Sequence, residues 1–148
     1  MNILKNLTGW AVIPVALLFI QPQPGFAQQT PKLADDEIAS VAVVANQNDI
    51  DFAGIAQKKS QNAEILKFAQ TMAADHKSVI DQAVALVTKL KVTPKDNAVS
   101  RKMVADAKKT EKTLNAKKGA SFDKAYIDNE VAYHKAVISA VENVLIPQ

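Results

Sequence analysis

The sequence predicts an all-α protein, an up-and-down antiparallel helical bundle. Apolar residues recur at intervals of three and four from residue 35 onward, which is the period of an amphipathic helix, and no stretch alternates cleanly enough for a strand. The breaks between the helical stretches are short, so consecutive helices are expected to run antiparallel. The chain contains no cysteine, so its core must hold by packing without disulfides.

The first 27 residues carry the pattern of a cleavable signal peptide. Lys5 precedes an apolar run from Thr8 to Ile20, and the small residues Gly25 and Ala27 follow it. We expect cleavage after Ala27 and export of the mature chain to the periplasm or cell envelope. The alternative is a membrane anchor, but the apolar run is too short to cross about 30 Å of hydrocarbon comfortably.

Composition limits the partners of the mature chain. The formal net charge of the whole chain is +3 at pH 7, but acidic and basic residues are interleaved, with no block of five like charges. Without cysteine there is no lipid-attachment residue at the cleavage site. We therefore expect neither nucleic acid as a partner nor, after cleavage, a transmembrane anchor.

Residues 28–34 form a short polar leader, predicted to be flexible, and residues 35–148 form the bundle domain. The first helix is expected over residues 35–59, because three acidic residues in its first turn suit the positive end of the helix dipole. Its apolar stripe consists of Ile38, Val41, Ala42, Ala45, Phe52, Ile55 and Ala56.

The second helix is expected to begin at a cap supplied by Ser60 or Asn62 and to reach about Lys91, since Pro94 disfavours a helical residue before it. Its apolar stripe consists of Ile65, Phe68, Ala69, Met72, Val79, Ile80, Ala83, Leu86, Val87 and Leu90.

A shorter third helix, which serves as a crossover, is expected over about residues 98–117, with Gly119 ending it. A fourth is expected over about residues 122–145, started by Ser121 or Asp123. The third stripe is thin and lies among many lysines. The fourth consists of Ile127, Val131, Val137, Ile138, Val141, Val144 and Leu145.

Polar residues occupy the apolar stripes near the middle of the three long helices. Asp49 lies on the first, His76 on the second and His134 on the fourth, and Glu130 shares a face with His134 because it precedes it by four residues. Midpoints of antiparallel helices meet at one level, so these four side chains are expected to converge. Two imidazoles and two carboxylates suit a divalent metal such as iron or zinc.

A second interpretation needs no metal. Burying an ionisable group is costly unless it is paired, and two histidines hydrogen-bonded to carboxylates form a satisfied polar layer by themselves. Met72, one turn before His76, is expected in the core, and Asp75 is expected to face solvent. Tyr126 and Tyr133 are expected to pack near the site with their hydroxyls bonded to partners.

Two motifs resemble a family of bacterial envelope proteins, the domain of unknown function 4142. They are Phe68-Ala69-Gln70-x-Met72-x-x-Asp75-His76 and Gly119-x-x-Phe122-Asp123-x-x-Tyr126, the second leading to His134. The resemblance implies a ferritin-like bundle with no established activity. It places the family's Asp-His and Tyr…His positions on Asp75, His76, Tyr126 and His134, and its first-helix acidic position on Asp49.

The chain departs from that pattern in two respects. A ferritin-type di-iron centre uses Glu-x-x-His on two helices, but Ala73 and Val131 stand three residues before His76 and His134. We therefore do not expect a ferroxidase. The resemblance also implies a further long helix after Gln148, whose absence would leave an apolar groove open.

We expect a second copy of the chain to close that groove, because the third helix is too lysine-rich to fill it. The lysines concerned are Lys108, Lys109, Lys112, Lys117 and Lys118.

Three functions follow as hypotheses. The first is a non-enzymatic binding or stress-related envelope protein with a buried histidine–carboxylate layer. The second is a metal-binding protein of ferritin type, for storage or oxidation. The third is a structural module that binds a partner.

Overall fold

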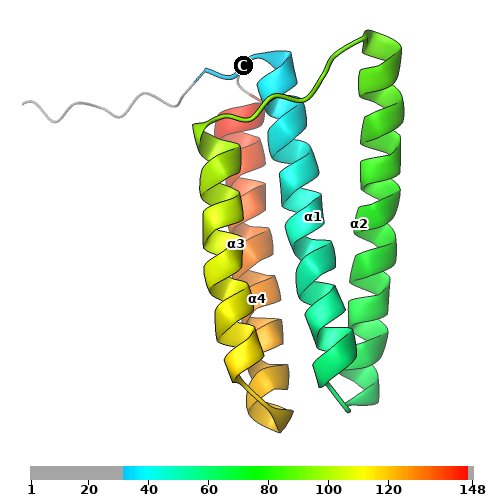
Figure 1. Ribbon diagram of the computed structural model, residues 1–148, viewed down its shortest axis with the longest axis vertical. Helices are drawn as coiled ribbons and strands as arrows, with labels where there is room; N and C mark the ends of the chain where they lie inside the picture. Colours follow the sequence, from blue (N-terminus) through cyan, green and yellow to red (C-terminus); the bar gives the residue numbers. More distant parts are fainter. Residues whose placement is uncertain (1–31, 147–148) are drawn as a thin grey trace, which may run out of the picture.

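Four long helices form an antiparallel bundle, as predicted (Figure 1). The structure is a computed structural model that describes residues 32–146, so the predicted signal peptide lies outside the described residues. The helices are α1 (Asp35–Lys59), α2 (Ala63–Leu90), α3 (Ala98–Ala116) and α4 (Gly119–Ala140), and a π-helical turn, η1 (Val141–Leu145), follows α4. None of the helices described is long and apolar enough to cross a membrane.

The helix ends follow the local signals in the sequence. The backbone amide of Ala34 donates to Glu37 of the acidic first turn of α1, at 3.1 Å. Asn62, one of the two predicted caps, accepts from the amide of Glu64 at 2.9 Å and begins α2. Lys91 ends α2 in the left-handed conformation, with φ of 56°.

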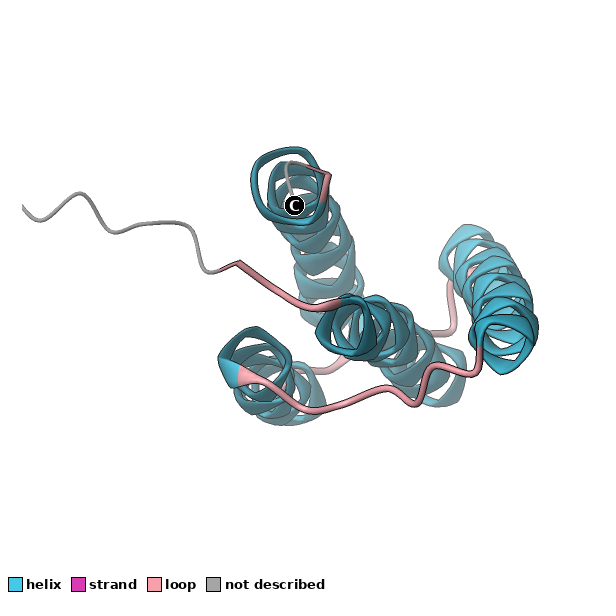
Figure 2. Ribbon diagram, turned by 90° about the horizontal axis from the view of Figure 1, so that it is seen from above, coloured by secondary structure: helices cyan, strands magenta, loops and turns pink. Residues whose placement is uncertain are grey.

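The segment 91–97 carries the chain from α2 across the N-terminal end of α1 to α3 (Figure 2). The amide of Lys95 donates to the carbonyl of Asp36 at 2.9 Å, and the Asn97 side chain donates to the carbonyl of Glu37 at 3.0 Å while its oxygen caps α3. α1 therefore lies between α2 and α3. α2 and α3 run antiparallel, as their connection predicted, but they are not neighbours because α1 separates them (Figure 1).

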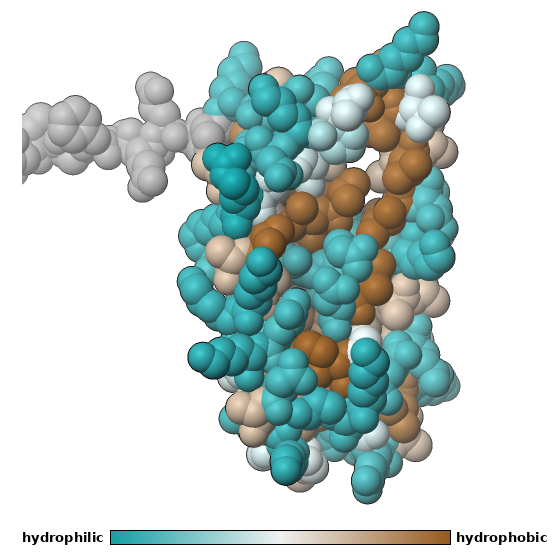
Figure 3. Space-filling model, viewed as in Figure 1, coloured by the Kyte–Doolittle hydropathy of each residue, from teal (hydrophilic) through white to brown (hydrophobic). Residues whose placement is uncertain are grey.

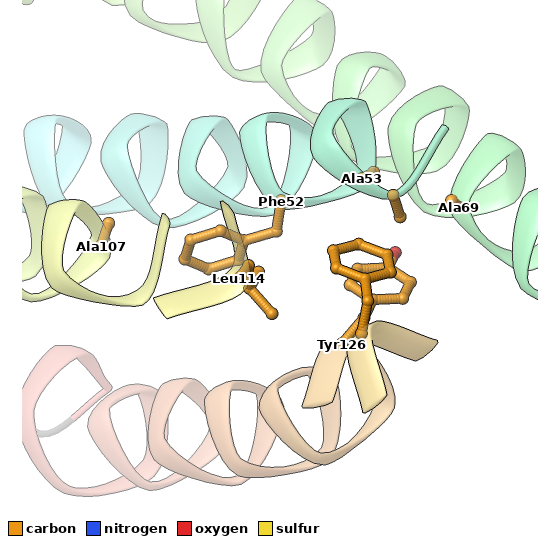
Figure 4. Packing of buried hydrophobic residues seen from close by; sticks show 8 residues of the cluster. Phe52, Ala53, Ala69, Ala107, Leu114 and Tyr126 are labelled. Carbon is orange, nitrogen blue, oxygen red and sulfur yellow. The ribbon is translucent and has the colours of Figure 1, made fainter. Parts of the chain in front are cut away.

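The hydrophobic core lies where the C-terminal half of α1 meets the N-terminal ends of α2 and α4 (Figure 4). Its aromatic members contact one another: Phe122 and Tyr126 stack with ring centroids 6.3 Å apart, and Tyr126 meets Phe68 at 6.1 Å. α3 contributes Ala107 and Leu114, so its thin stripe suffices to join the bundle. The lysines that were expected to keep α3 from filling the open groove lie away from this core, since all except the half-buried Lys117 are exposed.

Apolar stripes on α2 and α4 continue beyond this core into solvent. The bundle was predicted to bury them, and for the following residues that prediction is wrong: Val79, Leu86 and Leu90 of α2, Val131 and Ile138 of α4, and Val141 of η1 are exposed. α2 packs extensively against α1 alone, and its outer face has no helical partner among residues 32–146. Hydrophobic residues consequently appear on the molecular surface along α1 and α2 (Figure 3).

Gly119 begins α4 instead of ending α3, which corrects the predicted start near residue 122. α3 ends at Ala116, and Gly119 takes φ of 52°, in the left-handed region that glycine enters without a steric penalty. Phe122 therefore lies within the first turn of α4, and it is fully buried.

Candidate metal centre

Three ionisable side chains from three different helices meet inside the bundle. Nε2 of His76 lies 3.1 Å from Oδ2 of Asp49, and Nε2 of His134 lies 3.4 Å from the same oxygen. The two imidazole rings have centroids 5.6 Å apart. One ligand atom from each residue lies within 4.8 Å of the other two, so the three residues form a group that could hold a single metal ion.

The antiparallel packing explains this meeting. Asp49 and His76 lie near the middles of α1 and α2, His134 lies in the C-terminal half of α4, and both α2 and α4 pack against α1. The carboxylate of Asp49 is 1% exposed, and the His76 and His134 side chains are 21% and 40% exposed. The carboxyl group of Asp49 is therefore buried, and the two imidazoles lie between it and the solvent.

Each imidazole is also held through its other nitrogen. Nδ1 of His134 lies 2.8 Å from the backbone carbonyl oxygen of Glu130, one turn earlier in α4. Nδ1 of His76 lies 2.8 Å from Oδ1 of Asn46, a residue of α1 that the sequence analysis did not single out. The available signal was its spacing, because Asn46 precedes Asp49 by three residues and shares its helix face.

Glu130, the fourth predicted member, is not one of the three converging ligands. It is 2% exposed, and its Oε2 is 3.9 Å from Nδ1 of His134. Burial, and then the neighbouring carboxyl of Asp49, raise the pKa of Glu130 to about 9. Glu130 therefore keeps its proton at neutral pH.

That proton bears on a group of buried oxygens without partners. Within residues 32–146, neither carboxyl oxygen of Glu130 nor Oδ1 of Asp49 has a hydrogen-bond donor from another group. Two carboxylates facing each other would repel, whereas a neutral carboxyl group donates a hydrogen bond to its charged neighbour. The protonated Glu130 thus supplies one hydrogen-bond donor to the carboxyl group of Asp49.

The two tyrosines of α4 differ in their hydroxyl contacts. Tyr133 donates to the carbonyl of Ala45 at 2.9 Å and accepts from the side chain of Asn48 at 3.2 Å, as predicted for a packed tyrosine with a bonded hydroxyl. Burial raises its pKa to about 12, and the nearby carboxyl groups of Asp49 and Glu130 add to that shift. Tyr126 is also buried, but its hydroxyl has no partner within the described part of the chain, which corrects the prediction for this residue.

A cavity of about 50 Å³ lies at the mouth of the site. Its walls combine the candidate ligands with Asn46, the ring of Tyr133, Ala45 and Val137. Asp75 is exposed and Met72 packs against the core, as predicted, so neither joins the three ligand atoms. The cavity has room for a water-sized group beside the three ligands.

The similarity of the chain to known proteins is at the level of a family. No curated protein and no solved structure matches it significantly. The family described as Domain of unknown function (DUF4142) matches residues 21–148, a range that includes every residue of the site and both motifs. The chain therefore belongs to the DUF4142 family.

Proposed function

We propose that this bundle binds one divalent transition metal ion, zinc or iron(II), through Asp49, His76 and His134. The observation that carries the proposal is the convergence of Oδ2 of Asp49 with Nε2 of both histidines. Two imidazoles and one carboxylate are a common ligand set for these metals. Three protein ligands leave at least one coordination position for water or a small molecule, and the adjoining cavity can hold it.

Electrostatics supports a cation at this position. Asp49 is almost completely buried, and a carboxylate there needs a compensating charge or several hydrogen bonds. The raised pKa of Glu130 keeps that neighbouring carboxyl group neutral, so it adds no second negative charge beside Asp49. A divalent ion would offset the charge of Asp49 and coordinate both rings.

The competing function is a polar layer without metal, in which protonated imidazoles pair with Asp49. The distances of 3.1 and 3.4 Å between each Nε2 and Oδ2 also fit such hydrogen bonds, although 3.4 Å is long for one. The two hypotheses differ in a measurable way, because only the first predicts stoichiometric metal.

We propose that the site binds a metal ion and does not carry out the oxidation of a ferritin-type di-iron centre. Ala73 and Val131 occupy the positions where a di-iron centre would carry glutamates, and neither side chain can coordinate a metal.

The predicted signal peptide supports a location of the protein in the periplasm or cell envelope. N-terminal sequencing of exported protein should then begin at Gln28, and an intact Met1 would contradict export with cleavage.

Metal analysis of protein purified without chelator tests the main proposal. We expect one equivalent of zinc or iron per chain, and we expect zinc added to the metal-free protein to raise its melting temperature, since a ligand at 100 times its dissociation constant stabilises by about 2.7 kcal/mol. His76→Ala and His134→Ala should each abolish both effects. Asp75→Asn, which alters the exposed neighbour of His76, is the matched control and should change neither.

Absence of metal from the purified protein would refute the proposal. If the wild-type protein carries no stoichiometric metal and its melting temperature does not respond to zinc or iron(II), the site is a hydrogen-bonded layer and the proposed function is wrong.

A further inference from the structure

We infer that Asn46 is a positioning residue that selects the tautomer of His76 and so leaves the Nε2 lone pair free for a metal. The inference rests on the proposed metal site and names a residue that acts on it without binding the ion. A metal accepts a histidine nitrogen only when that nitrogen carries no proton, and the hydrogen bond at the other nitrogen determines where the proton resides.

The orientation of the Asn46 amide is fixed by the backbone of its own helix. Its Nδ2 donates to the carbonyl oxygen of Ala42 at 2.8 Å. Turning the amide over would place two oxygens against each other, so Oδ1 must be the atom that faces His76. The amide therefore presents an acceptor to the ring.

An acceptor at this place requires a proton on the ring nitrogen that it meets. Nδ1 of His76 lies 2.8 Å from Oδ1 of Asn46, which is the length of a normal hydrogen bond, so Nδ1 carries the proton. In a neutral imidazole Nε2 is then unprotonated, and Nε2 is the atom that lies 3.1 Å from Asp49. Without a proton or a cation between them, these two acceptors face each other unfavourably.

His134 reaches the same state by a different route. Its Nδ1 lies 2.8 Å from the backbone carbonyl of Glu130, which is always an acceptor, so no side chain is required to fix this ring. Asn46 therefore matters for one imidazole only. This asymmetry provides an internal control, since a change at residue 46 should alter His76 and leave His134 unchanged.

Nitrogen-15 spectra of the two histidines in metal-free, full-length protein, recorded at a pH where both are neutral, test the inference. We expect both rings as the Nδ1–H tautomer in the wild-type protein. Asn46→Leu removes the acceptor at similar size, so His76 should change to the Nε2–H tautomer, which can donate to Asp49, while His134 stays unchanged. Zinc affinity should fall about 10- to 100-fold, as for other residues that orient metal-binding histidines.

Two further variants separate positioning from general structural damage. Asn46→Asp loses the hydrogen bond to the carbonyl of Ala42 but still offers Nδ1 an acceptor, so it should preserve the Nδ1–H tautomer of His76. Gln47→Leu alters the neighbouring exposed amide, which bonds to Asp51, and should leave both measurements at their wild-type values.

An unchanged His76 tautomer in Asn46→Leu would overturn the inference, as would the Nε2–H form in the wild-type protein. Because the tautomer is measured without metal, failure of zinc to bind the wild-type protein would refute the proposed function and leave the role of Asn46 to be decided by the spectra.

Discussion

Replacing Glu130 by glutamine should make the metal-free protein more stable at neutral pH and change how its stability depends on pH. Glutamine has nearly the shape of a protonated glutamate, and its amide can still donate a hydrogen bond to Asp49. What the substitution removes is the ionisable proton of a carboxyl group that is 2% exposed.

The direction and size of the effect follow from the pKa of Glu130 in the two states. The group has an ordinary value of 4.5 in the unfolded chain and about 9 in the folded protein. Between those values unfolding releases the proton, so rising pH favours the unfolded state. The stability that the protonated Glu130 contributes is fully present below the unfolded-state pKa of 4.5, and it is lost as pH rises through the folded-state pKa of about 9. The slope is at most about 1.4 kcal/mol per pH unit, or about 3 kcal/mol from about pH 5.5 to about pH 7.5.

Urea unfolding followed by circular dichroism, with chelator present, measures this at several pH values. The quantity of interest is the difference in unfolding free energy between Glu130→Gln and the wild-type protein, because titration of the histidines is common to both. This difference should grow in favour of the variant as pH rises. Glu142→Gln, which removes an exposed carboxyl group, controls for the lost charge.

A difference that stays constant across this range would refute the reasoning, since it would mean that Glu130 titrates alike in the folded and unfolded states. The partnerless oxygens beside Asp49 would then need another explanation.

Three further predictions concern the bundle. Phe52→Ala should destabilise the protein by about 3–5 kcal/mol in urea unfolding, because Phe52 is 1% exposed and its ring packs edge-on against Tyr133 at 5.5 Å; a cost below about 1 kcal/mol would contradict the described core. Lys91→Gly should stabilise by about 1 kcal/mol in the same assay, since Lys91 has φ of 56° and glycine adopts that conformation without strain. Purified mature protein should self-associate in light scattering through the exposed apolar residues of α2 and α4, and a stable monomer that binds no hydrophobic dye would rule this out.

The sequence determined the helices because their signals are local. α1 occupies the predicted residues 35–59, and Asn62 begins α2 as one of its two predicted caps. The site was predictable for a related reason: ionisable residues interrupted apolar stripes at the middles of three helices, and helix midpoints in an antiparallel bundle lie at one level. Asp49, His76 and His134 meet in the structure as this spacing predicted.

Only the tertiary structure decided which stripes are buried. Val79 and Ile138 occur at the same helical spacing as core residues, but both are exposed. The period of a helix defines its apolar side without specifying which element covers that side. On the outer face of α2, no helix among the described residues covers it. The protonated state of Glu130 and the contact between Asn46 and His76 likewise depend on side chains far apart in the sequence. Local patterns determine the direction in which a side chain points, and the packing of the helices determines what it meets there.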